Sequence, residues 1–238
     1  WAVRGHLHLI TGRAQDQLTF DLQVECAHAL GYEGKDGRRA VEYFMQDFYL
    51  YATKVGELTR IFLTALEATH IKQPRSLSGI LRRLRKLKPD FAVAQNRLTF
   101  KNEDTALNDP LNILRIFEEG LRTGLLIHPD AMRLVVANLD LIDTEMRETP
   151  EAKRIFLDLL LKHGNPERAL RRLNELGVLG AYIPEFQRIV AMMQFDLYHH
   201  YTVDEHTIQC ISILNKIERG DLIEELPVAT GILKKGVN

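Results

Sequence analysis

The chain has 238 residues, of which 45% are hydrophobic and 26% are charged, a composition typical of a globular protein that buries a core. A formal net charge of −1 argues against a surface devoted to nucleic acid or to an anionic membrane. No run approaches the ~20 apolar residues that span a bilayer, so we expect no membrane partner.

The two cysteines, Cys26 and Cys210, lie far apart and form no metal or redox motif. They predict a cytoplasmic protein without a disulfide framework. The chain starts at Trp1 rather than Met, and no signal peptide pattern follows. We therefore expect a piece of a longer protein, in which groups needed for chemistry lie elsewhere.

The first histidines, His6 and His8, stand two positions apart in "HLHL". On a helix this spacing points their side chains to nearly opposite sides, so they cannot hold one ion. We predict two partly packed histidines. A long helix is then predicted from Arg38 to His70, with a kink at Gly56.

A basic stretch follows in "KQPRSLSGILRRLRKLKP". One interpretation is a patch that binds phosphates of a nucleotide or nucleic acid. The other is a solvated connector, which the absence of interleaved aromatic residues and the near-zero net charge favour. Its basic residues are Lys72, Arg75, Arg82, Arg83, Arg85, Lys86 and Lys88.

The segment "FAVAQNRLTFKN" breaks the helical pattern. Residues from Phe91 to Gln95 alternate in type, and Asn96 is suited to a turn, so a small hairpin is predicted near 91–101. Further helices are then expected. Asp109 and Pro110 should start the first of them.

Two adjacent helices are predicted in "ETPEAKRIFLDLLLKHGNPERALRRLNELGVLG". Thr149 should cap the first and Gly164 should end it; Asn165 should start the second and Gly177 should end it. The predicted fold is therefore mostly α, a bundle-like array of helices with one small β-hairpin.

The stretch "FDLYHHYTVDEHT" gathers three histidines and three acidic residues. Thr202 and Glu205 fit a capping box, and the charge of Asp204 suits a helix start, so these residues already have a structural role. Helix geometry places His206 on the same side as Cys210, Ile213, Leu214 and Ile217. We predict that this side faces inward.

An inward histidine is more often a packed core residue than a metal ligand. A metal would need two or three further ligands, and spacing leaves His199 and His200 undecided. The chain contains no HExxH, GxSxG, Walker A or GxGxxG motif, and no Gly-Ser followed by D-x-D.

Three blocks of the sequence nevertheless resemble one known family. They are "WAVRGHLHLITGRAQDQLTFDLQ", "NLDLIDTEMRETPEAKRIFLDLL" and "RRLNELGVLGAYIPEFQRIVAMMQFDLYHHYTVDEHT". These are similar to bacterial bifunctional PII uridylyltransferase/uridylyl-removing enzymes. The first block resembles the segment after that family's nucleotidyltransferase core, and the last resembles the opening of its HD-type phosphohydrolase domain.

The resemblance implies an enzyme of nitrogen regulation that transfers UMP from UTP to a Tyr of the PII signal protein and hydrolytically removes it, with glutamine as effector. Residues 1–185 would be the helical domain after the transferase core, and 186–238 the truncated start of the HD domain. A divalent metal, Mg or Mn, would serve the parent enzyme.

By the same resemblance, His206 matches the first histidine of the HD metal site, whose other ligands are absent from this chain. His199 and His200 could lie beside that site. Arg13 and Asp21 are candidates for shaping the nucleotide pocket. We expect the chain alone to catalyse neither reaction.

Two alternatives remain at this point. One is a stand-alone helical module that binds a partner protein. The other is a fragment of an RNA-processing nucleotidyltransferase, which would require the basic stretch to bind RNA. The block "YTVDEHT" is accounted for by the first resemblance alone, and nucleic acid is therefore an unlikely partner.

Overall fold

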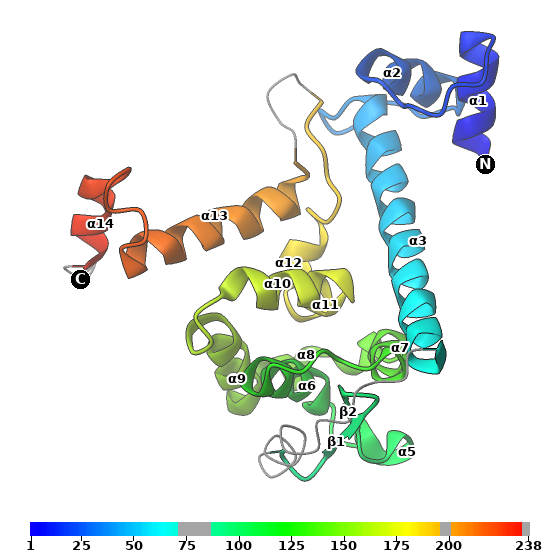
Figure 1. The fold of residues 1–238 in the computed structure, drawn as a ribbon. Coiled ribbons are helices and arrows are strands. Elements are labelled where there is room, and N and C mark those ends of the chain that lie inside the picture. The colour runs from blue at the N-terminus through cyan, green and yellow to red at the C-terminus, as the bar shows by residue number, and fades with distance from the viewer. Residues whose placement is uncertain (71–86, 196–200, 235–238) are drawn as a thin grey trace. The chain divides into compact units, whose positions relative to one another are not determined.

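The computed structural model describes residues 1–70, 87–195 and 201–234. Within these ranges the chain is mostly helical and contains one two-stranded antiparallel sheet, so the predicted fold class is confirmed (Figure 1). The chain divides into two units, Trp1–Gly56 with Arg188–Thr207, and Glu57–Gln187 with Ile208–Asn238. Each unit has a hydrophobic core of its own.

The first unit is built on α1 (Ala2–Thr11), α2 (Phe20–Ala29) and the first part of α3 (Ala40–His70). Apolar faces of these three helices meet because their buried residues recur at helical spacing. The core residues are Leu7, Cys26, Ala27, Val41, Phe44 and Met45.

A segment from late in the sequence completes the first unit. The Gln46 side-chain amide donates to the carbonyl oxygen of Val190 at 3.0 Å, and the Phe195 N–H donates to the Glu42 carboxylate at 3.0 Å. The Phe195 ring stacks on Phe20 with centroids 3.9 Å apart. Residues 188–195 are therefore held by both backbone and aromatic contacts.

The long predicted helix is present as α3, which begins at Ala40 rather than Arg38. Arg38 instead pairs with Lys35 across a tight turn, in which Asp36 and Gly37 have φ values of 51° and 76°. Such positive φ values end a regular helix. The helix continues through Gly56 without interruption, and the division between the two units falls at this residue.

The predicted hairpin is present as β1 (Phe91–Ala94) and β2 (Arg97–Phe100), with Phe91 opposite Phe100. Gln95, expected in a strand, lies in the turn with Asn96, and both have positive φ. A two-residue hairpin turn of type I′ requires this conformation at both positions. β2 also pairs with a third segment, since the N–H of Leu98 donates to the Leu126 carbonyl oxygen at 2.8 Å.

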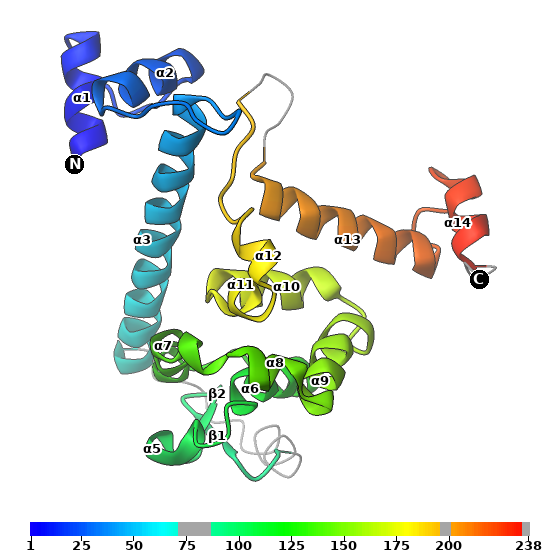
Figure 2. The same ribbon diagram turned by 180° about the vertical axis from the view of Figure 1, so that it is seen from behind.

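Further helices follow the hairpin along the chain (Figure 2). Residues of α6 and α7 contact β2, and α6, α9 and α10 contact one another. In chain order the remaining elements are α5 (Glu103–Ala106), α6 (Asn112–Thr123), α7 (Pro129–Ala137), the 3₁₀ turn η1 (Leu139–Leu141), α8 (Thr144–Glu148), α9 (Pro150–Leu161), α10 (Pro166–Glu175), α11 (Val178–Tyr182), α12 (Pro184–Gln187), α13 (Val203–Arg219) and α14 (Pro227–Lys234).

The predicted caps of α9 and α10 are confirmed. The Thr149 hydroxyl accepts a hydrogen bond from the N–H of Ala152 at 3.2 Å, and the Asn165 side chain accepts one from Arg168 at 3.0 Å. Gly164 and Gly177 adopt left-handed conformations, with φ of 67° and 74°. These two glycines end their helices because the left-handed region carries little steric cost for a residue without Cβ.

The helix predicted to start at Pro110 begins at Asn112 instead. The Asp109 carboxylate accepts a hydrogen bond from the N–H of Leu111 at 3.1 Å, and the Ile113 N–H bonds to the Pro110 carbonyl. Asp109 therefore caps this tight turn, and the regular helix begins only after the turn.

Candidate functional site

The first turn of α13 carries the histidine that the sequence singles out. The helix begins at Val203, directly after Thr202 as predicted, and the His206 N–H donates to the Thr202 carbonyl oxygen at 2.9 Å. The prediction that His206 faces inward is wrong, because its side chain is exposed. Its helical neighbours Ile213 and Leu214 are 45% and 55% exposed.

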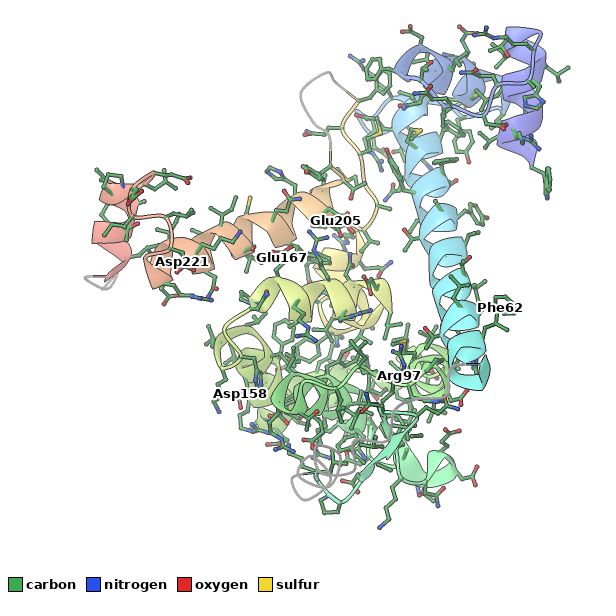
Figure 3. All side chains as sticks on the ribbon, in the orientation of Figure 1. Phe62, Arg97, Asp158, Glu167, Glu205 and Asp221 are labelled. Carbon is green, nitrogen blue, oxygen red and sulfur yellow. The ribbon has the colours of Figure 1, made fainter. Side chains whose placement is uncertain are left out.

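From Ile208 onward, α13 belongs to the second unit. Ile208 is fully buried in the hydrophobic core, and the Ser212 hydroxyl donates to the carboxylate of Glu167 on α10 at 2.5 Å. Figure 3 labels Glu167. Hydrogen bonds from Ser212 and Arg171 lower the pKa of Glu167. Ile217, which helix geometry groups with His206, is buried, so the side that carries His206 is exposed at the start of the helix and buried only further along it.

His206 does not belong to a metal cluster within the described chain. No group of three or more His, Cys, Asp or Glu side chains in residues 1–70, 87–195 and 201–234 is arranged to hold an ion. His199 and His200 lie outside the described residues. The described residues therefore do not fit a complete metal centre.

The two proposed nucleotide-contacting residues are exposed and stand on different elements. Arg13 lies in the loop after α1, where its carbonyl oxygen accepts a hydrogen bond from the Thr11 hydroxyl at 3.0 Å. Asp21 lies in the first turn of α2. Their positions alone define no pocket.

A large open cavity of about 910 Å³ does lie in the first unit, and neither Arg13 nor Asp21 lines it. Its walls are mainly apolar side chains of α1 and α3, Phe44 and Phe48 among them. No sequence motif indicated this cavity, because its lining is ordinary helix-face residues.

Two polar pairs stand on the wall of this cavity. The Tyr32 hydroxyl donates to the Asp47 carboxylate at 2.8 Å, and burial, aided by this bond, raises the pKa of Tyr32 to about 12. Arg4 donates to Asp16 at 2.7 Å, and hydrogen bonds from Arg4 and His8 lower the pKa of Asp16. His6 and His8 are each partly buried on α1, as predicted.

Lys88 is the one basic residue of this stretch inside the described range. Its ammonium group donates to Glu118 at 2.6 Å, and its backbone N–H donates to the fully buried Glu119 at 3.2 Å. Arg122 also binds Glu119. Lys88 therefore anchors the chain to α6, and the other basic residues of the stretch lie outside the described residues.

His128 caps α7 with a ring nitrogen. Nδ1 accepts a hydrogen bond from the Asp130 N–H at 3.2 Å, so Nε2 carries the proton that it donates to Gln95 at 3.1 Å. This arrangement requires a neutral imidazole. Burial lowers the pKa of His128, and the charge of Arg97 acts in the same direction.

We expect acid to destabilise the second unit through His128. A folded-state pKa below the unfolded value of 6.5 means that the unfolded chain binds the proton more tightly. The contribution of neutral His128 to the free energy of unfolding is complete at a pH above the unfolded-state pKa. It is lost as the pH falls through the lower folded-state pKa. Between about pH 7 and 5, the free energy of unfolding measured with urea should fall more steeply for the wild type than for His128→Asn. An asparagine can also cap the helix, but it does not titrate in this range. Equal slopes would contradict this role.

Two family models match the chain. "Uridylyltransferase GlnD third domain" matches residues 91–182, and "GlnD PII-uridylyltransferase" matches residues 1–63. By these matches, two parts of the chain are similar to regions of GlnD-type uridylyltransferases. No solved structure matches the chain significantly.

Curated relatives extend the likeness to the full chain. It is 66% identical over 238 residues to a "Bifunctional uridylyltransferase/uridylyl-removing enzyme" of Ruegeria pomeroyi, and 64% identical over the same length to one of Cereibacter sphaeroides. It covers 26% of the length of each. The predicted resemblance is confirmed: over its full length the chain is related to these enzymes, and it spans about a quarter of theirs. Within the described residues, no helix is both long and apolar enough to cross a membrane.

Proposed function

We propose that the chain is the helical region of an enzyme that transfers UMP from UTP to the PII signal protein and hydrolytically removes it. The observation that carries this proposal is the 66% and 64% identity, over all 238 residues, to proteins named for both activities. The third-domain model over residues 91–182 supports it.

Within that enzyme, residues 1–185 form the helical region after the transferase core, and residues 186–238 begin the HD-type domain. His206 supplies the first imidazole of the HD metal site. This role is compatible with its exposed position on α13, which leaves the ring accessible to ligands from other parts of a longer protein. His199 and His200 lie close to His206 in sequence and are proposed neighbours of the site.

Arg13 and Asp21 are proposed to help shape the nucleotide pocket beside the transferase core. Both side chains are exposed, so neither is committed to the core of the first unit. UTP is the proposed substrate, Mg or Mn the proposed metal, and glutamine the proposed effector. The enzyme is proposed to work in the cytoplasm.

An assay with purified PII and UTP tests this function. A full-length protein containing this sequence should add UMP to PII and remove it, whereas the 238-residue chain should do neither, because it contains no Gly-Ser with D-x-D and no complete metal cluster among its described residues. Mass spectrometry of PII measures both reactions. Transfer of nucleotides to RNA by the full-length protein, with PII unmodified, would contradict the proposal.

A further inference from the structure

The second unit contains a small cavity between β2, α3, α7 and α10. Its volume is about 150 Å³, and Arg97 of β2 and Arg172 of α10 both line it. Thr64 of α3 contributes a hydroxyl group, and Leu126, Pro129 and Met132 are among the apolar residues of the wall. Arg97, labelled in Figure 3, is paired with Ala94 and so lies next to the hairpin turn.

A second, smaller cavity adjoins the first and adds a third guanidinium group. Arg168 and Arg172 both line it, one helical turn apart on α10, and it shares Leu126 and Met132 with the first cavity. Three arginines from two elements that are distant in sequence thus surround one apolar floor. Only the fold brings Arg97 close to α10.

The charges of these arginines are incompletely neutralised within the described chain. Arg172 forms an ion pair with Glu175 at 3.0 Å. Among the residues that the structure describes, no carboxylate pairs with the guanidinium groups of Arg97 and Arg168. Arg97 is only partly exposed, so solvent screens its charge less than that of a fully exposed arginine.

Neighbouring groups indicate a positive potential around the cavity. Pro129 is the first residue of α7, so the positive end of that helix dipole lies at the wall. His128, directly before Pro129, has a lowered pKa, caused by burial and then by the charge of Arg97. Glu103 opposes this effect on His128, and Asp130 is held by Arg133.

The size and chemistry of the cavity limit its ligand. About 150 Å³ is several times the ~30 Å³ that a water occupies in the liquid, and is below the ~300 Å³ at which typical small-molecule pockets start. Guanidinium groups bind the oxygens of phosphate and carboxylate in a bidentate geometry. Such a volume admits one phosphoryl-sized anion and excludes a complete nucleotide.

We propose that Arg97, Arg172 and Arg168 form a binding site for a phosphoryl anion, supplied either as free phosphate or pyrophosphate or as the terminal phosphate of a nucleotide whose remainder lies outside the cavity. Arg97 and Arg172 contact the anion, and Arg168 adds charge from the adjoining cavity. The Thr64 hydroxyl is positioned as a neutral donor. The site is independent of the metal site proposed for His206, and it would exist whether or not the uridylylation function is correct.

Calorimetric titration of the 238-residue chain with inorganic phosphate and with pyrophosphate tests the site. We expect saturable binding that weakens as NaCl is raised. Arg97→Gln and Arg172→Gln should each weaken binding about tenfold or more, since hydrogen bonds to charged groups are among the strongest that proteins make. A parallel titration with UMP distinguishes a free anion from a nucleotide phosphate.

A matched control separates the site from general charge. Arg147→Gln removes the same charge from α8, outside both cavities, and should leave binding unchanged. Circular dichroism checks that each variant is folded, and Arg172→Gln keeps the test valid if the hairpin does not tolerate Arg97→Gln. Binding of UMP with the same dependence on Arg97 and Arg172 would support the shared phosphoryl chemistry.

Three results would overturn the proposal. The first is absence of phosphate, pyrophosphate and UMP binding at millimolar concentrations. The second is an equal effect of Arg147→Gln and the cavity variants, which would show unspecific attraction. The third is Arg97-dependent binding of a Glu-rich peptide without binding of the phosphoryl anions, which would assign the arginines to an acidic protein partner.

Discussion

His206→Ala in the full-length enzyme should abolish removal of UMP from PII while leaving its addition nearly unchanged. Changes to residues that merely support a metal ligand cost about 10–100-fold, so loss of a ligand itself should lower the removal rate by at least about 100-fold. Because the side chain is exposed, the substitution creates no cavity and should shift stability by less than about 0.5 kcal/mol. The two rates are measured separately on PII and on PII carrying UMP.

His163→Ala provides the control for this experiment. His163 follows α9 in the second unit, outside the stretch that carries the proposed metal site, and both rates should stay within about twofold of wild type. The metal role of His206 would be contradicted by equal loss of both activities in a folded variant, or by removal that continues at the wild-type rate.

Leu159→Ala should destabilise the second unit by about 2–5 kcal/mol. Leu159 is fully buried on α9, where it belongs to the large core cluster with Ile155 and Leu173. Truncation removes apolar contacts and leaves a cavity that rigid helices cannot close. Since a whole domain is stable by only about 5–15 kcal/mol, this change is a large fraction of the total.

The matched control lies two residues further along the same helix. Leu161 is 75% exposed, so Leu161→Ala should change the free energy of unfolding by less than about 0.5 kcal/mol. Urea unfolding followed by circular dichroism measures both variants. Equal losses for Leu159→Ala and Leu161→Ala would mean that the packing of α9 differs from that described.

The sequence predicts local structure well wherever one residue type has a strong backbone preference. Thr149, Asn165, Gly164 and Gly177 are placed correctly because capping and left-handed turns depend on the residue itself and its immediate neighbours. The hairpin is predicted for the same reason, although Gln95 lies in the turn. Helical periodicity predicts the first residue of a helix less exactly. Two helices begin at Asn112 and Ala40, each two residues after the predicted start.

The orientation of His206 is beyond what periodicity alone can decide. Helix geometry groups His206 with Ile213, Leu214 and Ile217, yet only Ile217 of these is buried. Contacts between distant parts of the chain, such as the hydrogen bond between Ser212 and Glu167, 45 residues apart in the sequence, are not visible in the periodicity. The arginine site is invisible to the sequence for the same reason, because Arg97 and Arg172 carry no shared motif.

The pairing of Leu98 with the segment before α7 bears on how the hairpin avoids aggregation. The N–H of Leu98 donates to the carbonyl oxygen of Leu126, and the carbonyl oxygen of Leu98 accepts from the N–H of His128 at 2.7 Å. The centre of this edge of β2 is therefore already hydrogen-bonded. A strand edge with unpaired backbone groups is a template for association with other chains. Residues 126–128 thus block edge-to-edge addition on that side, and shortening the loop after Gly124 would expose it.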